Sequence, residues 1–188
     1  PLNAVRVRER GFNQALEIFP HADCYFNLAV LANLRGDKEE SIELMKKALS
    51  QQPYNSEFQA ILAYIVYEVN AHAGIREAEK ALLASPHNTV AHLLFAEHFR
   101  RMGEPALARQ HFEAVLEAED NNPMARLALM EMGVDHDLPG LVRVHMGALM
   151  TAEHDLDDYL DPSLPQRYFS LYRPNLEKIE QARKACLK

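Results

Sequence analysis

Turn residues that recur at a nearly constant spacing constrain the fold of this 188-residue chain more than any other feature. Gly36 and Gly103 each follow an apolar stretch with helical periodicity, and they lie 67 residues apart. Pro53 and Pro86 each follow a second such stretch and lie 33 residues apart. A period of about 34 residues with two helices per period is typical of a helical repeat protein. The spacing therefore predicts stacked helix-turn-helix units.

The first and third units are the most regular. In the first unit, large and small residues share one face of the helix that Gly36 ends: Tyr25, Leu28, Ala29 and Ala32. The third unit repeats this pattern before Gly103, with His92, Phe95, Ala96 and Phe99. Pro105 then suits a first helical turn, where its missing amide proton costs no hydrogen bond. Each unit is therefore expected to bury one helix face on which large and small side chains alternate.

The middle unit is less regular. Leu62, Ala63 and Val66 fit its first helix, and the second helix is fitted by Gly74, Ala78, Ala81 and Leu82. Asn70 stands where a turn glycine is expected, and the 33-residue spacing indicates that this turn lacks one residue. Asn adopts the left-handed conformation more readily than most residues. The sequence therefore predicts Asn70 as a left-handed helix cap.

The flanking segments predict partial units. Residues 1–21 are expected to form an N-terminal helix that is a partial repeat or a cap, ahead of the three repeats in residues 22–122. Residues 123–152 read as a degenerate fourth helical pair, with Gly133 ending the first helix and Pro139 in the first turn of the second. Residues 153–188 read as an acidic linker followed by capping helices.

The C-terminal helices are expected to cover the last apolar face of the stack, which a helical repeat protein cannot leave open. A short helix is predicted near residues 166–172 and a final helix over residues 175–187. One face of the final helix carries Leu176, Ile179, Ala182 and Cys186. In an alternative interpretation this tail leads to a partner surface, with anchors at Tyr168, Phe169 and Tyr172.

The segment from Ala22 to Asn122 resembles the tetratricopeptide repeat family, because turn glycines, closing prolines and small-large alternation recur over three units. The resemblance implies an all-α, right-handed α-solenoid with a helical C-terminal cap. It also implies a non-catalytic interaction module or scaffold that binds a peptide or protein in the concave groove of the first helices. The alternative is the repeat region of a larger enzyme or secretion and assembly protein. The unpaired first helix and the missing initial Met motivate that alternative.

Family geometry places the groove residues one position after each large core residue and again about four and seven positions later. In this chain those positions are Phe26, Val30 and Asn33; Ala60, Tyr64 and Tyr67; and Leu93, Glu97, Arg100 and, at the edge, Arg101. The groove is expected to be apolar and aromatic in its first half and charged in its second. The two arginines pair with an acidic group of the partner or lie as solvated charges near a helix end. Phe26 and Val30 stand where chaperone-binding members carry Lys and Asn, so no chaperone tail is expected.

Charge and motifs exclude several functions. A net charge of −7 without a basic run disfavours nucleic acid. No apolar run reaches the ~18 residues of a membrane span, so no direct membrane insertion is expected. His136, His145 and His154 lack metal-ligand spacing, and the acidic residues 155–161 lack the glycine of a calcium loop. Nucleophile and phosphate-loop motifs are missing. The chain is therefore predicted not to be an enzyme and to hold no metal or cofactor.

The compartment and the assembly follow less directly from the sequence. Cys24 and Cys186 form no paired motif and are interpreted as unrelated free thiols. A cytoplasmic location is expected, or a periplasmic one if an upstream signal has been removed. Self-association through the ends of the stack is a further hypothesis, because an uncapped repeat exposes its apolar face.

Overall fold

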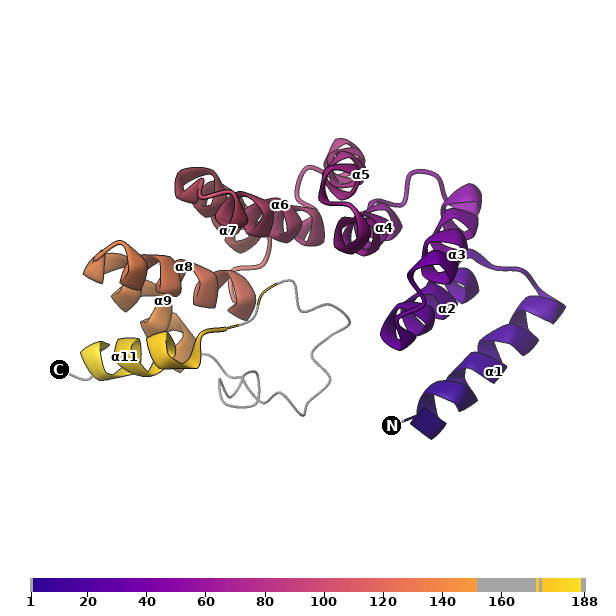
Figure 1. Cartoon of the computed structure of the whole chain (residues 1–188), viewed down its shortest axis with the longest axis horizontal. Coiled ribbons are helices and arrows are strands. Elements are labelled where there is room, and N and C mark those ends of the chain that lie inside the picture. The colour runs from indigo at the N-terminus through magenta and orange to yellow at the C-terminus, as the bar shows by residue number, and fades with distance from the viewer. Residues whose placement is uncertain (1, 152–171, 173, 187–188) are drawn as a thin grey trace. The chain divides into compact units, whose positions relative to one another are not determined.

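A computed structural model describes residues 2–151, 172 and 174–186 (Figure 1). Regular structure in these residues is helical throughout, which confirms the all-α helical-repeat fold. The helices are α1 (Leu2–Ile18), α2 (Ala22–Arg35), α3 (Lys38–Gln51), α4 (Ser56–Val69), α5 (Ala71–Ala84), α6 (Thr89–Arg101), α7 (Pro105–Ala118), α8 (Pro123–Asp135), α9 (Pro139–Thr151) and α11 (Leu176–Cys186). The chain divides between Ala91 and His92 into two compact units.

Some of the sequence-based assignments stay interpretations. The acidic linker of residues 153–161 and the short helix predicted near residues 166–172 lie outside the described residues, apart from Tyr172. The division into residues 1–21, 22–122, 123–152 and 153–188 likewise remains a prediction, since the two compact units follow a different boundary.

In the N-terminal unit, α2 and α3 form the helix pair that the sequence predicts. Gly36 has a φ of 88°, and its amide donates to the carbonyls of Ala32 and Asn33, which gives the predicted left-handed cap. The buried Ser41 hydroxyl donates to the Ala29 carbonyl over 2.8 Å and ties α3 to α2. Ala29, Ala32 and Ala48 are fully buried, so the small residues let the two helices approach closely.

The turn between α4 and α5 differs from its prediction. Asn70 is not left-handed but extended, with a φ of −149° and a ψ of 106°. The backbone amide of Asn70 donates to the Val66 carbonyl at the end of α4. The side-chain oxygen of Asn70 accepts from the Ala73 backbone amide at the start of α5. One residue thus ends one helix and caps the next, which accounts for the shortened turn. Gly74 then lies against Tyr67 without room for a side chain.

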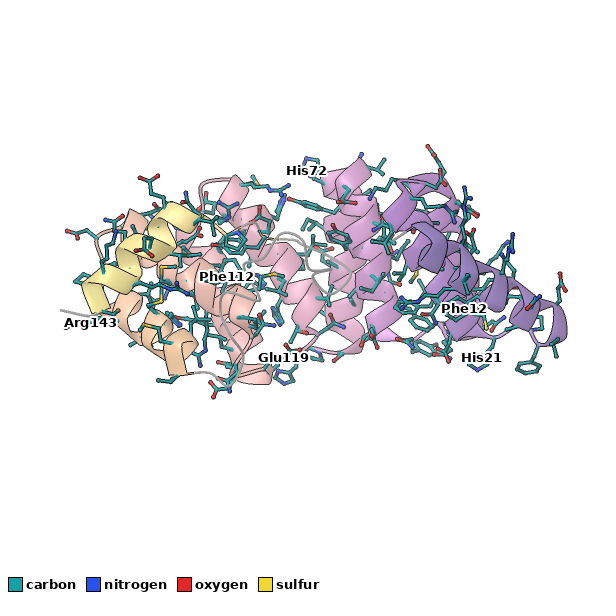
Figure 2. All side chains as sticks on the ribbon, turned by 90° about the horizontal axis from the view of Figure 1, so that it is seen from below. Phe12, His21, His72, Phe112, Glu119 and Arg143 are labelled. Carbon is teal, nitrogen blue, oxygen red and sulfur yellow. The ribbon has the colours of Figure 1, made fainter. Side chains whose placement is uncertain are left out.

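In the C-terminal unit, Gly103 has a φ of 76° and Pro105 begins α7, as the sequence predicts. Phe112 of α7, labelled in Figure 2, is 1% exposed and lies in the core of this unit. The expectation that Gly133 ends a helix was wrong, because α8 continues to Asp135 and the left-handed residue is Asp137, with a φ of 52°. Gly133 instead provides the close approach of Val142 from α9.

The terminal helices pack on their neighbours. α11 lies beside α8 and α9 (Figure 1), with Ile179 and Ala182 buried as predicted. Leu176 was predicted on the same buried face but is 61% exposed, because it occupies the first residue of α11. At the other end, α1 contacts α2, and the guanidinium of Arg35 pairs with the carboxylate of Glu9 at 2.5 Å.

Candidate partner-binding surface

The positions that the sequence assigns to a groove lie on α2, α4 and α6, the first helices of their repeats. In the N-terminal unit they form two layers. Val30, Tyr64 and Tyr67 are buried, with exposed fractions between 5% and 7%. Phe26 and Asn33 are half-buried and lie nearer the surface. The Phe26 ring stacks on Phe58 of α4 at 4.9 Å between centroids, so packing fixes its orientation. Ala60 is completely buried, and Leu93 of α6 is 7% exposed.

A polar cluster joins two of the assigned residues in the N-terminal unit. The Lys38 ammonium donates to the Asn33 side-chain oxygen over 2.6 Å and pairs with the Glu68 carboxylate. The Tyr64 hydroxyl donates to the same carboxylate over 2.9 Å. Asn33, Lys38, Tyr64 and Glu68 therefore link α2, the start of α3, and α4 through one chain of hydrogen bonds. This polar cluster is part-exposed, since the Lys38 and Glu68 side chains are 29% and 36% exposed.

On α6, Glu97, Arg100 and Arg101 form an arginine cluster. Glu97 has only 3% of its side chain exposed, yet its carboxylate accepts two hydrogen bonds from Arg100, at 2.7 and 2.9 Å, and one from Arg101 at 2.7 Å. The hydrogen bond to Glu97 is the largest cause that raises the pKa of Arg100. A guanidinium carries five N–H donors, so three bonds do not exhaust two arginines. With 45% and 59% of their side chains exposed, both arginines remain accessible to an acidic group.

A pocket of about 320 Å³ lies next to the arginine cluster in the C-terminal unit. Its walls come from the end of α6, the start of α7, α8 and the residue Tyr172. Residues that give it chemical character are Arg100, Pro105, Glu131, Asp135, His136 and Tyr172. Tyr172 is 4% exposed, and its burial, followed by the nearby Glu131 carboxylate, raises the pKa of its hydroxyl. The pocket therefore combines cationic, anionic and aromatic groups.

Two histidines of the C-terminal unit have a pKa that burial lowers. His111 of α7 stacks on the rings of Phe95 and Phe99, and its Nδ1 lies 2.9 Å from the Nδ1 of His92. Burial, followed by the nearby His92, lowers the pKa of His111 to about 4. Burial also lowers the pKa of His145 to about 4. Within the described residues, no three His, Cys, Asp or Glu side chains gather in a way that could hold a metal ion.

The sequence-based assignment missed four charged residues on or beside the first helices: Lys38, Glu68, Glu131 and Asp135. Lys38 and Glu68 join the polar cluster, while Glu131 and Asp135 meet the C-terminal segment. Glu131 carried a usable signal, because it is the only charged residue between Leu127 and Val134. A lone carboxylate in an apolar helix needs a donor from outside that helix, and here the donor is a backbone amide.

None of the helices in the described parts of the chain is both long and apolar enough to cross a bilayer. Cys24 and Cys186 are free thiols.

Residues 9–56 match the family model described as a tetratricopeptide repeat. No curated protein matches the sequence. Among solved structures, the fold is similar to PilF of Pseudomonas aeruginosa, at 17% identity and a TM-score of 0.72 over 98% of this chain and 81% of that one. It is also similar to a thermophilic TPR protein of Thermus thermophilus, at 18% identity and a TM-score of 0.67 over 100% of this chain and 93% of that one. A crystal structure of MamA matches with 18% identity and a TM-score of 0.59 over 76% of this chain and 85% of that one.

Proposed function

We propose that this tetratricopeptide repeat protein is a non-catalytic module that holds a peptide or protein segment against the first helices of its repeats. The observation that carries the proposal is the repeat fold. In a stack of helix pairs, each pair packs against its neighbours and leaves one face that a partner can cover. Charged and aromatic side chains at the assigned positions support it, because such groups give a surface specificity for an extended or helical segment.

In the N-terminal unit, the proposed surface has an apolar floor and a polar edge. Val30, Tyr64 and Tyr67 form the floor, where burial fixes their positions. Phe26 and Asn33 lie above the floor and are the residues we expect to touch a partner directly. An apolar partner side chain would cover the ring of Phe26, and the polar cluster around Lys38 would bind its backbone or a charged group.

In the C-terminal unit, Glu97, Arg100 and Arg101 form the charged part of the proposed surface. Glu97 holds the two guanidinium groups in place, so they are already oriented for a further acceptor. A carboxylate on the partner is the group that arginine binds best, through paired N–H donors. We therefore propose a partner segment with apolar anchors and at least one acidic group.

The remaining expectations are part of the same proposal. The net charge of −7 disfavours nucleic acid, and we propose a protein or peptide as the partner. We place the module in the cytoplasm and retain self-association through the repeat ends as a hypothesis, since the repeat fold permits it.

Quantitative affinity capture followed by mass spectrometry tests the proposal. The full chain would be compared with an Asn33→Ala/Arg101→Ala double variant, which changes one assigned residue in each compact unit. Arg101 is chosen because Arg100 still supplies two hydrogen bonds to Glu97 when Arg101 is lost. A Lys46→Ala/Lys80→Ala variant is the matched control. Both lysines lie on the second helices α3 and α5, and their side chains are about as exposed as that of Arg101.

We expect proteins captured by the wild-type chain and by the control to fall about tenfold or more in the double variant. Equal capture by all three chains would show that the assigned residues do not bind the partner. The circular dichroism melting curves of the variants would confirm that both are folded.

A further inference from the structure

The C-terminal segment of the chain lies on the same first-helix surface that the proposed function assigns to a partner. Tyr172 lines the pocket beside Arg100 of α6 and Glu131 of α8. The backbone amide of Asn175 donates to Oε1 of Glu131 over 2.5 Å. Lys178 pairs with the Asp135 carboxylate at 2.5 Å. The three residues are spaced by three positions, so the segment presents an aromatic ring, an amide and an ammonium to one surface.

We propose that Tyr172, Asn175 and Lys178 act as a tethered ligand on the surface of α6 and α8. The site that they occupy recognises a peptide with an aromatic residue followed, six positions later, by a basic residue. A partner with this pattern binds there by displacing the chain's own segment. This inference rests on the proposed function, because it names the chemistry of a partner for the C-terminal unit.

The acidic side of the site consists of two carboxylates on one face of α8. Glu131 and Asp135 are four residues apart, and residues at that spacing lie one above the other on a helix. Glu131 is 8% exposed, and a buried carboxylate without donors is costly. The backbone amide of Asn175 donates to it, and the Tyr172 hydroxyl lies beside it. When the segment leaves, Glu131 therefore needs an equivalent donor, and a partner's backbone amide can supply it.

The aromatic side of the site is a pocket that the Tyr172 ring lines. The Tyr172 hydroxyl is buried and lies beside the Glu131 carboxylate. The pocket of about 320 Å³ adjoins the same ring. A partner whose aromatic side chain fills more of this space would compete with the tethered segment for the pocket.

The residues of α11 that cover the apolar end of the repeat stack are different from Tyr172, Asn175 and Lys178. Ile179 and Ala182 are 2% and 1% exposed and pack α11 on α8 and α9. The polar contacts of Asn175 and Lys178 lie at or before the first turns of α11 and are made to charged groups of α8. A cap needs apolar burial, whereas a row of complementary charges and an aromatic anchor is the form of a recognition site.

A fluorescently labelled synthetic peptide with the sequence of residues 172–186 tests the proposal by fluorescence anisotropy. In the full-length wild-type chain, the tethered segment occupies the site and the labelled peptide binds weakly. In full-length Tyr172→Ala, the tethered segment loses its anchor, and we expect the peptide to bind at least about tenfold more tightly. Tyr54→Ala is the matched control, because Tyr54 is 91% exposed on the other unit.

Charge exchange then tests the register of the contact. In the Tyr172→Ala background, Asp135→Lys should weaken the wild-type peptide about tenfold, and a Lys178→Glu peptide should restore the binding. A peptide with Tyr172→Ala should bind at least about tenfold more weakly than the wild-type peptide. If Tyr172→Ala fails to fold by circular dichroism, full-length Lys178→Ala replaces it, because that variant removes a single ion pair.

Equal peptide binding by the wild-type chain and by the Tyr172→Ala chain would overturn the tethered ligand. Peptide affinity that does not change with Asp135→Lys or with the Lys178→Glu peptide would overturn it as well. This failure is distinguishable from failure of the proposed function. Partner capture that depends on Asn33 and Arg101 would persist if only the tethered ligand were wrong. If the peptide binds but no partner capture depends on Asn33 and Arg101, the site for the tethered segment stands and the proposed function of the chain is wrong.

Discussion

The Gly74 backbone lies so close to Tyr67 that a β-carbon at Gly74 would stand 2.4 Å from the Tyr67 Cα. This approach follows from the shortened turn, in which Asn70 alone separates α4 from α5. Two helices joined by one residue converge within the next turn, where only a hydrogen atom fits between the backbones.

Gly74→Ala is therefore expected to destabilise the chain by about 1–3 kcal/mol or more, because the added methyl group meets backbone atoms. Urea unfolding followed by circular dichroism measures the change. Gly11→Ala is the control in the same unit: its β-carbon meets nothing within 4 Å, so helix propensity should stabilise it by up to about 1 kcal/mol. A Gly74→Ala chain as stable as the wild type would contradict the close approach.

Asn70 is expected to act as a helix N-cap. Asn70→Ala should lower the free energy of unfolding by about 0.5–2 kcal/mol, because the Ala73 amide loses its acceptor. Asn70→Asp keeps an acceptor and should be close to neutral in urea unfolding. A left-handed Asn70 would instead make Asn70→Gly stabilising, so a rise in stability for that variant would refute the extended conformation.

The elements of the fold were predictable where turn chemistry is local. Gly36, Gly103 and Pro105 occupy the turn and helix-start positions that the sequence indicates, because φ preference depends on one residue at a time. The roles of Asn70 and Gly133 were not predictable in the same way. Each depends on how closely a second helix approaches, which is decided by packing over a whole repeat.

The arginine cluster should show non-additive stability. Arg101→Ala alone is expected to cost less than about 1 kcal/mol, because Arg100 still pairs with Glu97. The Arg100→Ala/Arg101→Ala variant leaves a carboxylate with 3% exposure without these donors and should cost about 3–5 kcal/mol. Thermal unfolding of the two single variants and the double variant measures the coupling. Additive losses would argue that Glu97 does not depend on both arginines.

The buried His145 predicts a dependence of stability on pH. Its pKa is about 4 in the folded chain, against about 6.5 when unfolded, so the unfolded state binds more protons between these values. The contribution is fully present above about pH 6.5 and is lost as the pH falls toward 4. Stability should fall by up to about 2 kcal/mol between pH 7 and pH 5 through this residue.

His145→Leu should therefore reduce the difference in urea midpoint between pH 7 and pH 5. His72→Leu is the control, because His72 of α5, labelled in Figure 2, is exposed. If both variants keep the pH dependence of the wild type, His145 is not the group that titrates.

The candidate surface was only partly predictable from the sequence. Family geometry assigned Asn33, Tyr64 and Glu97 to the first helices α2, α4 and α6, where they lie, and their role in binding stays a prediction. It did not reveal that Glu97 would be neutralised by Arg100 from its own helix, since i, i+3 pairs are common on surfaces and rarely buried. The contact between Asn175 and Glu131 joins residues 44 positions apart, which no local pattern encodes.

Site-specific photo-crosslinking in living cells tests the central claim most directly, because it requires no prior identification of the partner. A photoreactive amino acid would be placed at Asn33 and at Arg101 on the first helices, and at Lys46 and Lys80 on the second helices. We predict a crosslinked species of higher mass at the first-helix positions and none at the second-helix positions. Crosslinks confined to Lys46 and Lys80, or absent from all four positions, would contradict binding by the first helices.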